Sequence, residues 1–286
     1  MPTLLVTGSA RGIGHELVQR AVALGDTVFA AVRKAADVVK FAPAPNLHVV
    51  VIDVADSASV TAGFAEVDRL LAGKPLHAVI NAAAIAPTGA VELTSVDEFE
   101  HTLNTNMMGS VRMLKAALPR LRGHDGRLIL VTSLWGRASG AMVGAYSATK
   151  HAIESLADST RRETMGMNLH VVIIEPGVVK TQMYTNQIAD TEKLMTAMSA
   201  TERSLYGAMY QRFCKVVAGA NGTAITASQA AMGIEKAVFA RRPKTRYRVG
   251  IDSKLVCFLN WLLPDRWMDA VMGASLNHKP VPPARG

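Results

Sequence analysis

Short apolar segments alternate along the chain with longer stretches whose apolar residues recur at helical spacing. The apolar segments are rich in Val, Ile and Leu and show little polar alternation, which is typical of parallel strands buried on both faces. The predicted strands are Thr3–Thr7, Thr27–Val32, His48–Asp53, Ala78–Asn81, Arg127–Ser133 and His170–Glu175, with a seventh near Tyr247–Val249.

The longer stretches are predicted to be helices, among them Gly14–Leu24, Ser57–Ala72, Val96–Leu121 and Ala145–Thr164. This alternation predicts an α/β fold, a doubly wound, Rossmann-like parallel sheet with helices on both faces. Ligands of such sheets bind beyond the carboxyl ends of the strands, so functional residues are expected just after each strand.

One domain is expected over residues 1–286, because no Pro/Gly/Ser-rich linker and no internal repeat divides the chain. Residues 182–221 are predicted to be a helical substrate lid whose Met side chains suit an apolar pocket. The alternative is that these side chains only pack the helices onto the domain. Residues 241–286 are a C-terminal extension, and its apolar segment Leu255–Leu263 is predicted to be a pocket wall, a subunit interface or a peripheral membrane contact.

Composition narrows the class of protein. Hydrophobic residues make up 49% of the chain, yet no apolar run reaches the roughly 20 residues of a transmembrane helix. The absence of a signal-peptide pattern, together with only two cysteines, predicts a reducing, cytoplasmic location. The net charge of +8 favours acidic ligands such as a dinucleotide. Nucleic acid is not expected because the cations are scattered without a binding motif, and no metal site is expected because the histidines lack partners with metal-type spacing.

A glycine-rich turn lies between the first predicted strand and the first helix. Gly8 permits a tight turn, Gly12 leaves room for a pyrophosphate and Gly14 allows close packing of helix and strand. Phosphates would meet the partial positive charge of the helix N-terminus. The sequence therefore predicts a dinucleotide site at Gly8, Ser9, Ala10, Arg11, Gly12, Ile13 and Gly14.

Tyr146 and Lys150 lie four residues apart on a predicted helix, so their side chains share one face. An ammonium next to a phenol favours the phenolate, and we expect it to lower the pKa of Tyr146 toward the working range of an acid/base catalyst. The alternative is an ordinary pair on a surface helix.

With its Gly-x3-Gly-x-Gly spacing and downstream Tyr-x3-Lys, the chain resembles the short-chain dehydrogenase/reductase family over about residues 3–182. Segments 246–250 and 262–266 are similar to its steroid and retinol dehydrogenase branch. The resemblance implies an oxidoreductase that moves a hydride between a nicotinamide and a secondary alcohol/ketone, or primary alcohol/aldehyde, of hydrophobic character. It also implies a homo-oligomer, a dimer or a tetramer.

The resemblance further implies a catalytic set of Asn106, Ser133, Tyr146 and Lys150. Tyr146 would protonate the carbonyl oxygen while Ser133 orients it. Lys150 would bond the nicotinamide ribose and lower the pKa of Tyr146, and Asn106 would link Lys150 to solvent. The rivals for the serine and asparagine roles are Thr132 and Asn104.

The resemblance implies NADP(H) rather than NAD(H). NAD enzymes usually place an acid at the end of the second strand, where this chain has Val32 followed by Arg33. Arg33 and Arg11 would hold a 2′-phosphate, because guanidinium groups suit bidentate contacts. The alternative is that Arg33 is merely solvated. The remaining implied cofactor residues are Asp53, Val54, Asn81, Ala82, Ala83, Tyr146, Lys150, Pro176, Gly177, Val179 and Thr181.

Segment 81–84 departs from the family pattern, because alanine replaces the usual glycine at position 84 and a positive φ is therefore not expected there. Two other functions are retained as hypotheses. One is a catalytically idle NADP(H)-binding regulator, and the other is a peripheral membrane or lipid-binding protein that uses Leu255–Leu263 and its basic flanks.

Overall fold

A computed structural model describes residues 1–219, 222 and 224–276 of the chain. Within this described part, a parallel sheet of seven strands has the order β3-β2-β1-β4-β5-β6-β9. The predicted α/β fold is confirmed, and each expected strand is present. Their bounds are β1 Thr3–Val6, β2 Thr27–Val32, β3 Leu47–Val51, β4 Ala78–Asn81, β5 Gly126–Val131, β6 Leu169–Pro176 and β9 Arg246–Val249.

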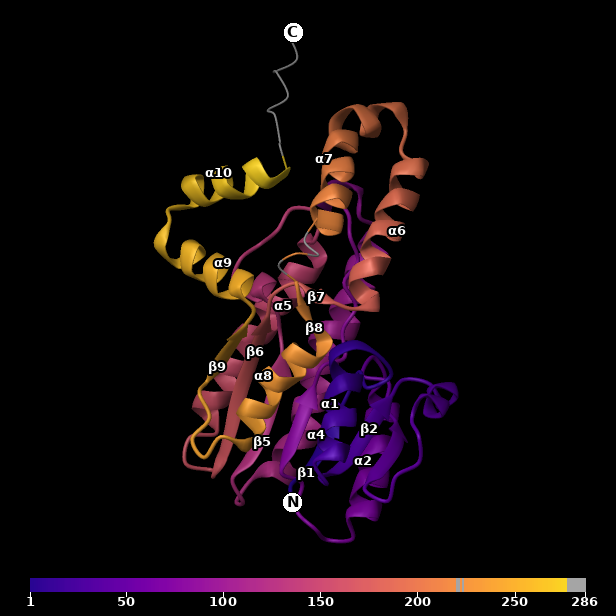
Figure 1. The fold of residues 1–286 in the computed structure, drawn as a ribbon, viewed down its shortest axis with the longest axis vertical. Coiled ribbons are helices and arrows are strands. Elements are labelled where there is room, and N and C mark those ends of the chain that lie inside the picture. The colour runs from indigo at the N-terminus through magenta and orange to yellow at the C-terminus, as the bar shows by residue number, and fades with distance from the viewer. Residues whose placement is uncertain (220–221, 223, 277–286) are drawn as a thin grey trace.

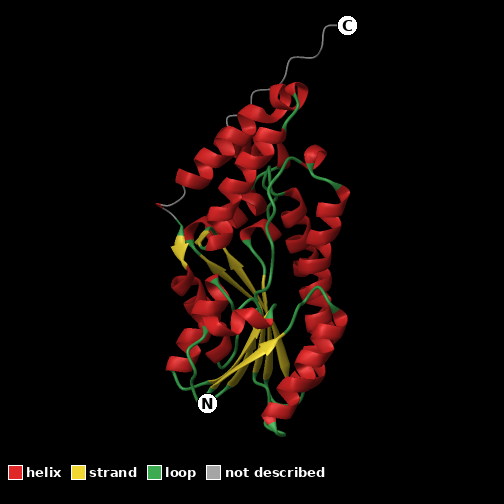
Figure 2. Ribbon diagram, turned by 90° about the vertical axis from the view of Figure 1, so that its right-hand side faces the viewer, coloured by secondary structure: helices red, strands yellow, loops and turns green. Residues whose placement is uncertain are grey.

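Successive side chains on each strand point into two separate hydrophobic layers, because strand side chains alternate between faces. On β5, Leu128 and Leu130 join one layer and Ile129 joins the other. The first layer is covered by α2 (Ser57–Leu71), α4 (Gly109–Leu121) and α5 (Gly144–Glu163), and the second by α1 (Gly12–Ala23) and α8 (Ala227–Phe239). Figure 2 shows helices on both sides of the sheet.

The helix expected over Val96–Leu121 has a π-helical middle section. It comprises α3 (Val96–Thr102), a π-helical segment η3 (Leu103–Met108) and α4. The Ser95 hydroxyl caps the start of α3 by accepting a hydrogen bond from the Glu98 N–H at 3.2 Å. Wider π turns often occur at functional positions in helices, and this one contains Asn106.

Two pairs of helices extend beyond the sheet at the same end of the molecule (Figure 1). One is the hairpin of α6 (Gln182–Ala197) and α7 (Ala200–Gly219), and the other is α9 (Ile251–Leu262) with α10 (Asp265–Leu276). The hairpin occupies the region predicted as a lid, although its expected last residue, Asn221, and residues 277–286 of the predicted extension lie outside the described part. The remaining elements are short: η1 Ala35–Lys40, η2 Val91–Leu93, η4 Leu134–Gly136, and the paired strands β7 Val179–Lys180 and β8 Ile225–Thr226.

Candidate active site

The glycine-rich turn joins β1 closely to α1. Gly8 and Gly12 have φ angles of 68° and 62°, in the left-handed region that side chains disfavour. A Cβ on Gly14 would lie 2.5 Å from the carbonyl oxygen of Gly8, so only glycine allows the helix to start this close to the turn. No side chain caps the N-terminus of α1. Its first N–H groups therefore suit the phosphates of a dinucleotide.

Thr7, which the sequence interpretation did not single out, holds the turn against the end of β4. Its hydroxyl donates to Asn81 Oδ1 at 2.7 Å and accepts from the N–H groups of Ala82 and Ala83 at 3.1 and 3.2 Å. Asn81 in turn donates to the Ser110 hydroxyl at 2.9 Å. The hydrogen bonds of Thr7 and Asn81 therefore position the backbone that follows β4.

Ser9 has a similar structural contact, since its buried hydroxyl donates to the Val6 carbonyl at 2.6 Å. Ala82 and Ala84 do not adopt positive φ angles. The alanines that replace the usual residues in this segment are therefore accommodated without backbone strain.

Arg11 is the last residue of the glycine-rich turn before α1, and Arg33 directly follows β2. Both side chains are exposed. They act on the same neighbour, because Lys40, Arg11 and Arg33 together lower the pKa of Asp37, with the Lys40 contact as the largest cause. Lys40 Nζ lies 2.6 Å from Asp37 Oδ1. The two predicted phosphate-binding guanidinium groups thus belong to one basic surface, where an additional phosphate would be favourable.

Asp53 and Val54 follow β3. The Asp53 carboxylate accepts a hydrogen bond from the Ala55 N–H at 2.9 Å and remains partly exposed. Val54 is buried against α4, where a Cβ on Gly109 would lie 2.9 Å from its side chain. Asp53 is therefore the more accessible of this predicted pair of adenine contacts.

Tyr146 and Lys150 lie one turn apart on α5, and Ser133 follows β5. Lys150 Nζ lies 5.5 Å from the centre of the Tyr146 ring and donates to the Val131 carbonyl at 2.9 Å. The Ser133 hydroxyl accepts from the Trp135 N–H at 3.2 Å and also contacts Tyr146 through a side-chain hydrogen bond. All three residues line one cavity, so the structure brings together the predicted serine, tyrosine and lysine.

The expected effect of Lys150 on Tyr146 is not seen in this structure. Burial raises the pKa of Tyr146 to about 12, and the hydrogen bond with Ser133 only partly opposes this rise. Burial also lowers the pKa of Lys150 to about 8, while Glu154 acts in the opposite direction. Desolvation is therefore the largest cause of both shifts, and Lys150 is not among the groups that shift the pKa of Tyr146.

The rivals of the predicted catalytic residues are engaged elsewhere. The Thr132 hydroxyl contacts Glu154 Oε1 at 2.7 Å and the Ile174 carbonyl at 3.0 Å. Asn104 donates to the Ala55 carbonyl at 3.3 Å and accepts from Arg112 at 2.8 Å. Ser133 therefore has the better position for contact with a ligand beside Tyr146.

Asn106 is buried in the π-helical segment. Its amide donates to the Ile85 carbonyl and accepts from the Ile85 N–H, both at 2.9 Å, and it also donates to Thr149 Oγ1 at 3.1 Å. These bonds tie the helix to the loop after β4 and to α5. The Asn106 side chain therefore connects three elements around the site and holds the π-helical segment in place.

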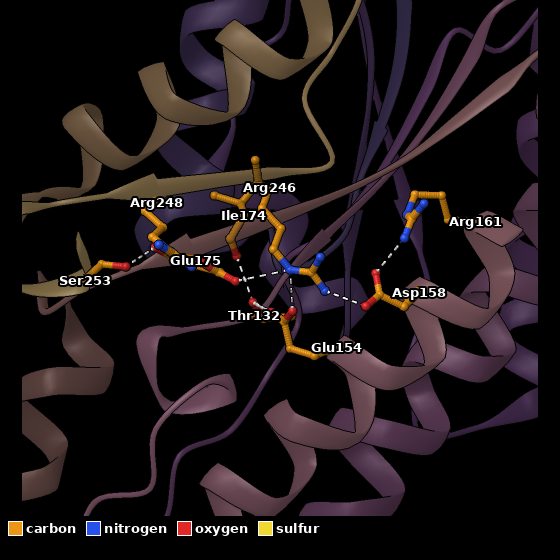
Figure 3. A network of polar contacts seen from close by, with 9 residues as sticks. All are labelled: Thr132, Glu154, Asp158, Arg161, Ile174, Glu175, Arg246, Arg248 and Ser253. Atoms are coloured by element: carbon orange, nitrogen blue, oxygen red, sulfur yellow. Dashed lines mark hydrogen bonds and ion pairs between the residues drawn. The ribbon is translucent and has the colours of Figure 1, made fainter. Parts of the chain in front are cut away.

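A network of carboxylates and arginines joins α5, β6 and β9 (Figure 3). Glu154, one turn beyond Lys150 on α5, contacts Arg246 at 3.0 Å. Arg248 contacts the fully buried Glu175 at 2.9 Å, and Arg246 also lies 3.4 Å from Glu175. Burial raises the pKa of Glu154, while Arg246 and Thr132 lower it. Glu154 was not predicted to belong to the site. The only local sign of it in the sequence is its spacing of four residues from Lys150.

The cavity beside Tyr146 has a volume of about 230 Å³ and a largely apolar wall. Several predicted cofactor residues line it, namely Ile13, Ala82, Pro176, Gly177, Val179 and Thr181. A Cβ on Gly177 would overlap the Asp252 carboxylate, which accepts from the Val178 N–H at 2.6 Å. This contact accounts for glycine in the loop after β6 and keeps its backbone against the cavity.

The hairpin α6–α7 closes the same cavity through side chains that include Met183, Tyr184 and Phe213. Two buried polar contacts hold the hairpin in place. The hydroxyls of Thr88 and Thr191 lie 3.0 Å apart, and the Ala90 N–H donates to the Tyr210 hydroxyl at 2.9 Å. The hairpin thus both lines the cavity and packs on the domain.

The apolar segment Leu255–Leu263 is divided between two environments. Cys257 is buried, and Asn260 and Leu263 line a second cavity, whereas Trp261 is 77% exposed. The segment is therefore in part a pocket wall. Among the described residues, no helix is both long and apolar enough to cross a bilayer.

The geometry agrees with comparisons against known proteins. A family model described as short chain dehydrogenase matches residues 2–192. The chain is 28% identical to the NADPH-dependent 3-dehydrocapnine reductase of Ornithobacterium rhinotracheale over 274 residues, which cover 93% of this chain and 94% of the relative. It is 30% identical to human retinol dehydrogenase 5 over 284 residues, with coverage of 94% and 87%.

Solved structures have the same fold. A short-chain dehydrogenase from Streptomyces avermitilis superposes with a TM-score of 0.74 at 23% identity and covers 96% of this chain and 94% of its own. A short-chain dehydrogenase from Burkholderia cenocepacia, solved in complex with NADP, gives 0.73 at 19% identity, with coverage of 95% and 97%. On the family match and the site geometry, the chain belongs to the short-chain dehydrogenase family of oxidoreductases.

Proposed function

We propose that the protein is an NADP(H)-dependent oxidoreductase that interconverts a hydrophobic alcohol and its ketone or aldehyde. The observation that carries the proposal is the convergence of Ser133, Tyr146 and Lys150 on one apolar cavity that adjoins the loop after β6 and the start of α1. The names of two relatives, an NADPH-dependent reductase and a retinol dehydrogenase, support the same reaction class.

The residues of the turn suit the cofactor. The uncapped start of α1 would bind the pyrophosphate. Gly12 lies opposite the Thr181 methyl group, and its φ of 62° is a backbone conformation that favours glycine in this turn. Arg11 and Arg33 are exposed where a 2′-phosphate would lie, which favours NADP(H) over NAD(H). When bound, the cofactor exchanges a hydride at its nicotinamide ring.

The chain's own residues would supply orientation and a proton. In the reducing direction, the Ser133 hydroxyl would donate a hydrogen bond to the substrate oxygen and hold it beside Tyr146. Tyr146 would then transfer its phenolic proton to that oxygen. The high pKa of Tyr146, about 12, keeps the phenol protonated before the reaction. The Lys150 ammonium would stabilise the phenolate that is left, and apolar walls would exclude water.

A turnover assay tests the proposal. The protein would be mixed with NADPH and a panel of lipophilic ketones and aldehydes, and loss of nicotinamide absorbance would be followed, with NADH in parallel. Faster turnover with NADPH is expected. Tight NADPH binding without turnover of any carbonyl compound would instead favour the idle regulator, although both Tyr146 and Lys150 are present.

Location and assembly complete the proposal. Cys214 and Cys257 are unpaired, which agrees with a reducing compartment such as the cytoplasm. Assembly as a dimer or tetramer is also proposed, and light scattering tests it. Co-sedimentation with liposomes tests the alternative of a peripheral membrane protein, for which the exposed Trp261 is one of the available apolar contacts.

A further inference from the structure

A second cavity lies next to the active-site cavity. Its volume is about 580 Å³, and it is lined by the segment after Ser133 together with α7, α9 and α10. We call it the outer cavity. The two cavities adjoin through a common wall, since both are lined by Trp135, Ala141, Phe213 and Val216.

The size of the active-site cavity limits what it can hold. Its volume of about 230 Å³ is below the range of roughly 300–1,000 Å³ that is usual for small-molecule sites. In the proposed function the same space must accept the nicotinamide end of the cofactor as well as the reacting carbonyl group. The rest of a bulky substrate must therefore lie elsewhere, and the outer cavity is the adjacent space.

The outer cavity has the chemistry of a site for an apolar chain. Its lining includes Met209, Leu263, Met268 and Met272. Met268 is buried, and methionine side chains adapt their shape to apolar ligands. The charged lining residues Arg137, Asp265 and Asp269 are exposed, so they lie toward solvent. An apolar ligand with its far end near water fits this distribution.

The C-terminal helices are fixed over the outer cavity by specific contacts. The Asn260 amide on α9 donates to the Arg137 carbonyl at 2.7 Å, which ties α9 to the segment after Ser133. Helix α10 contacts α7, and Met268 on α10 is buried. The outer cavity is thus lined by packed elements.

We propose that the outer cavity is the distal part of the substrate site and that it selects elongated, apolar alcohols and ketones. This inference rests on the proposed function, because it assumes that the reacting oxygen lies at Ser133 and Tyr146. The remainder of the substrate extends past the residues that line both cavities and lies between α7 and α10. Residues from the C-terminal extension thereby determine which substrates react fastest.

Filling the outer cavity from α10 tests the proposal. Gly273 lines the cavity, and a Cβ there would meet no atom within 4 Å, so Gly273→Trp places an indole in the space without a backbone clash. The matched control is Ala270→Trp, which adds the same side chain at an exposed position of α10 outside the cavity lining. Ser139→Trp fills the cavity from the opposite wall and serves if Gly273→Trp does not fold.

The probes are butanone and tridecan-2-one, each reduced with NADPH. Wild-type protein is expected to have a higher kcat/KM for the long ketone than for the short one. In Gly273→Trp the ratio of the two kcat/KM values should fall by at least about tenfold, since loss of even one well-packed methylene has such an effect. In Ala270→Trp the ratio should stay that of the wild type. A wild-type ratio in both Gly273→Trp and Ser139→Trp would overturn the proposal.

A binding measurement separates failure of this inference from failure of the proposed function. If wild-type protein reduces neither these ketones nor any carbonyl compound of the panel, the proposed function is wrong. Equilibrium dialysis of tridecan-2-one then decides the role of the outer cavity. Tighter binding to the wild type and to Ala270→Trp than to Gly273→Trp supports a site for apolar chains. Equal binding to all three proteins, or binding to none, excludes it.

Discussion

Glu154 lies one helical turn beyond Lys150 on α5, and its charge raises the pKa of that lysine against the effect of burial. Because Glu154 Oε1 also accepts from Thr132 at 2.7 Å, the carboxylate is held at the end of β5 that carries the site. A buried acid thus helps to maintain the charge of the active-site cation.

Replacement of Glu154 by Gln should shift the pH profile of the enzyme toward acid. Without the carboxylate the pKa of Lys150 falls further below its value of about 8, so the ammonium is lost at a lower pH. In a plot of log kcat/KM against pH, the alkaline limb should move to lower pH by several tenths of a pH unit or more. Asp158→Asn is the control, because Asp158 also contacts Arg246, at 2.9 Å, but does not contribute to the pKa shift of Lys150. An equal shift in both variants would assign the effect to Arg246.

Replacement of Lys150 by Met should stabilise the fold while it impairs the reaction. Burial lowers the pKa of Lys150 from 10.5 to about 8, so the ammonium costs free energy in the folded state below about pH 8. The gain in the free energy of unfolding should be about 1–3 kcal/mol near neutral pH. It should disappear as the pH rises from about 8 toward 10.5, where the lysine becomes neutral in both states.

Urea unfolding of Lys150→Met and wild type over this pH range measures the difference. The exposed Lys115→Met on α4 provides the control and should change stability little. A Lys150→Met variant that is less stable than the wild type at neutral pH would show that the hydrogen bond to the Val131 carbonyl outweighs desolvation of the ammonium.

Replacement of Tyr146 by Phe should abolish turnover and preserve cofactor binding. The ring packs with the hydrophobic cluster around Tyr210 and Phe213, so Phe keeps this packing and removes only the hydroxyl. The loss in kcat should be at least about 100-fold, the lower end of the usual range for general acid–base catalysis. Fluorescence titration with NADPH checks that binding is retained. Turnover close to that of the wild type would rule out Tyr146 as the proton donor.

Replacement of Arg33 by Ala should weaken the binding of NADPH and leave that of NADH almost unchanged. If the guanidinium binds the 2′-phosphate, its loss should raise KM for NADPH by about tenfold. This is the change expected when one charge-assisted hydrogen bond is lost. KM for NADH should change little, because NADH has no phosphate at this position. Steady-state kinetics with both cofactors make the comparison. Equal increases in the two KM values would leave Arg33 as a merely solvated residue.

Much of the fold could be predicted because its signals are local. Buried parallel strands are continuous apolar runs, and the glycines at 8, 12 and 14 mark a turn whose geometry only glycine allows. The order of strands follows from the doubly wound topology. The π-helical segment was not predicted, since residues 103–108 contain neither proline nor glycine to indicate a change in the helix.

The parts of the site that escaped prediction depend on distant pairs. Glu154 and Arg246 are 92 positions apart, and no local pattern shows that they meet. The direction of the shift in the pKa of Tyr146 was also predicted wrongly, since the pKa is raised and not lowered. The sequence places Lys150 on the same helix face, but only the folded structure shows how far burial disfavours both charges.

The position of β9 has a consequence for synthesis of the chain. Glu154 and Glu175 are in place once β6 has formed, but their arginine partners are on the last strand of the sheet. A nascent chain that stops before Arg246 contains the complete Ser133, Tyr146 and Lys150 set, yet it would have to bury Glu154 and Glu175 without their arginine partners. Chains that end before β9 should therefore be markedly less stable than the full-length protein, although every residue of the catalytic set has already been synthesised.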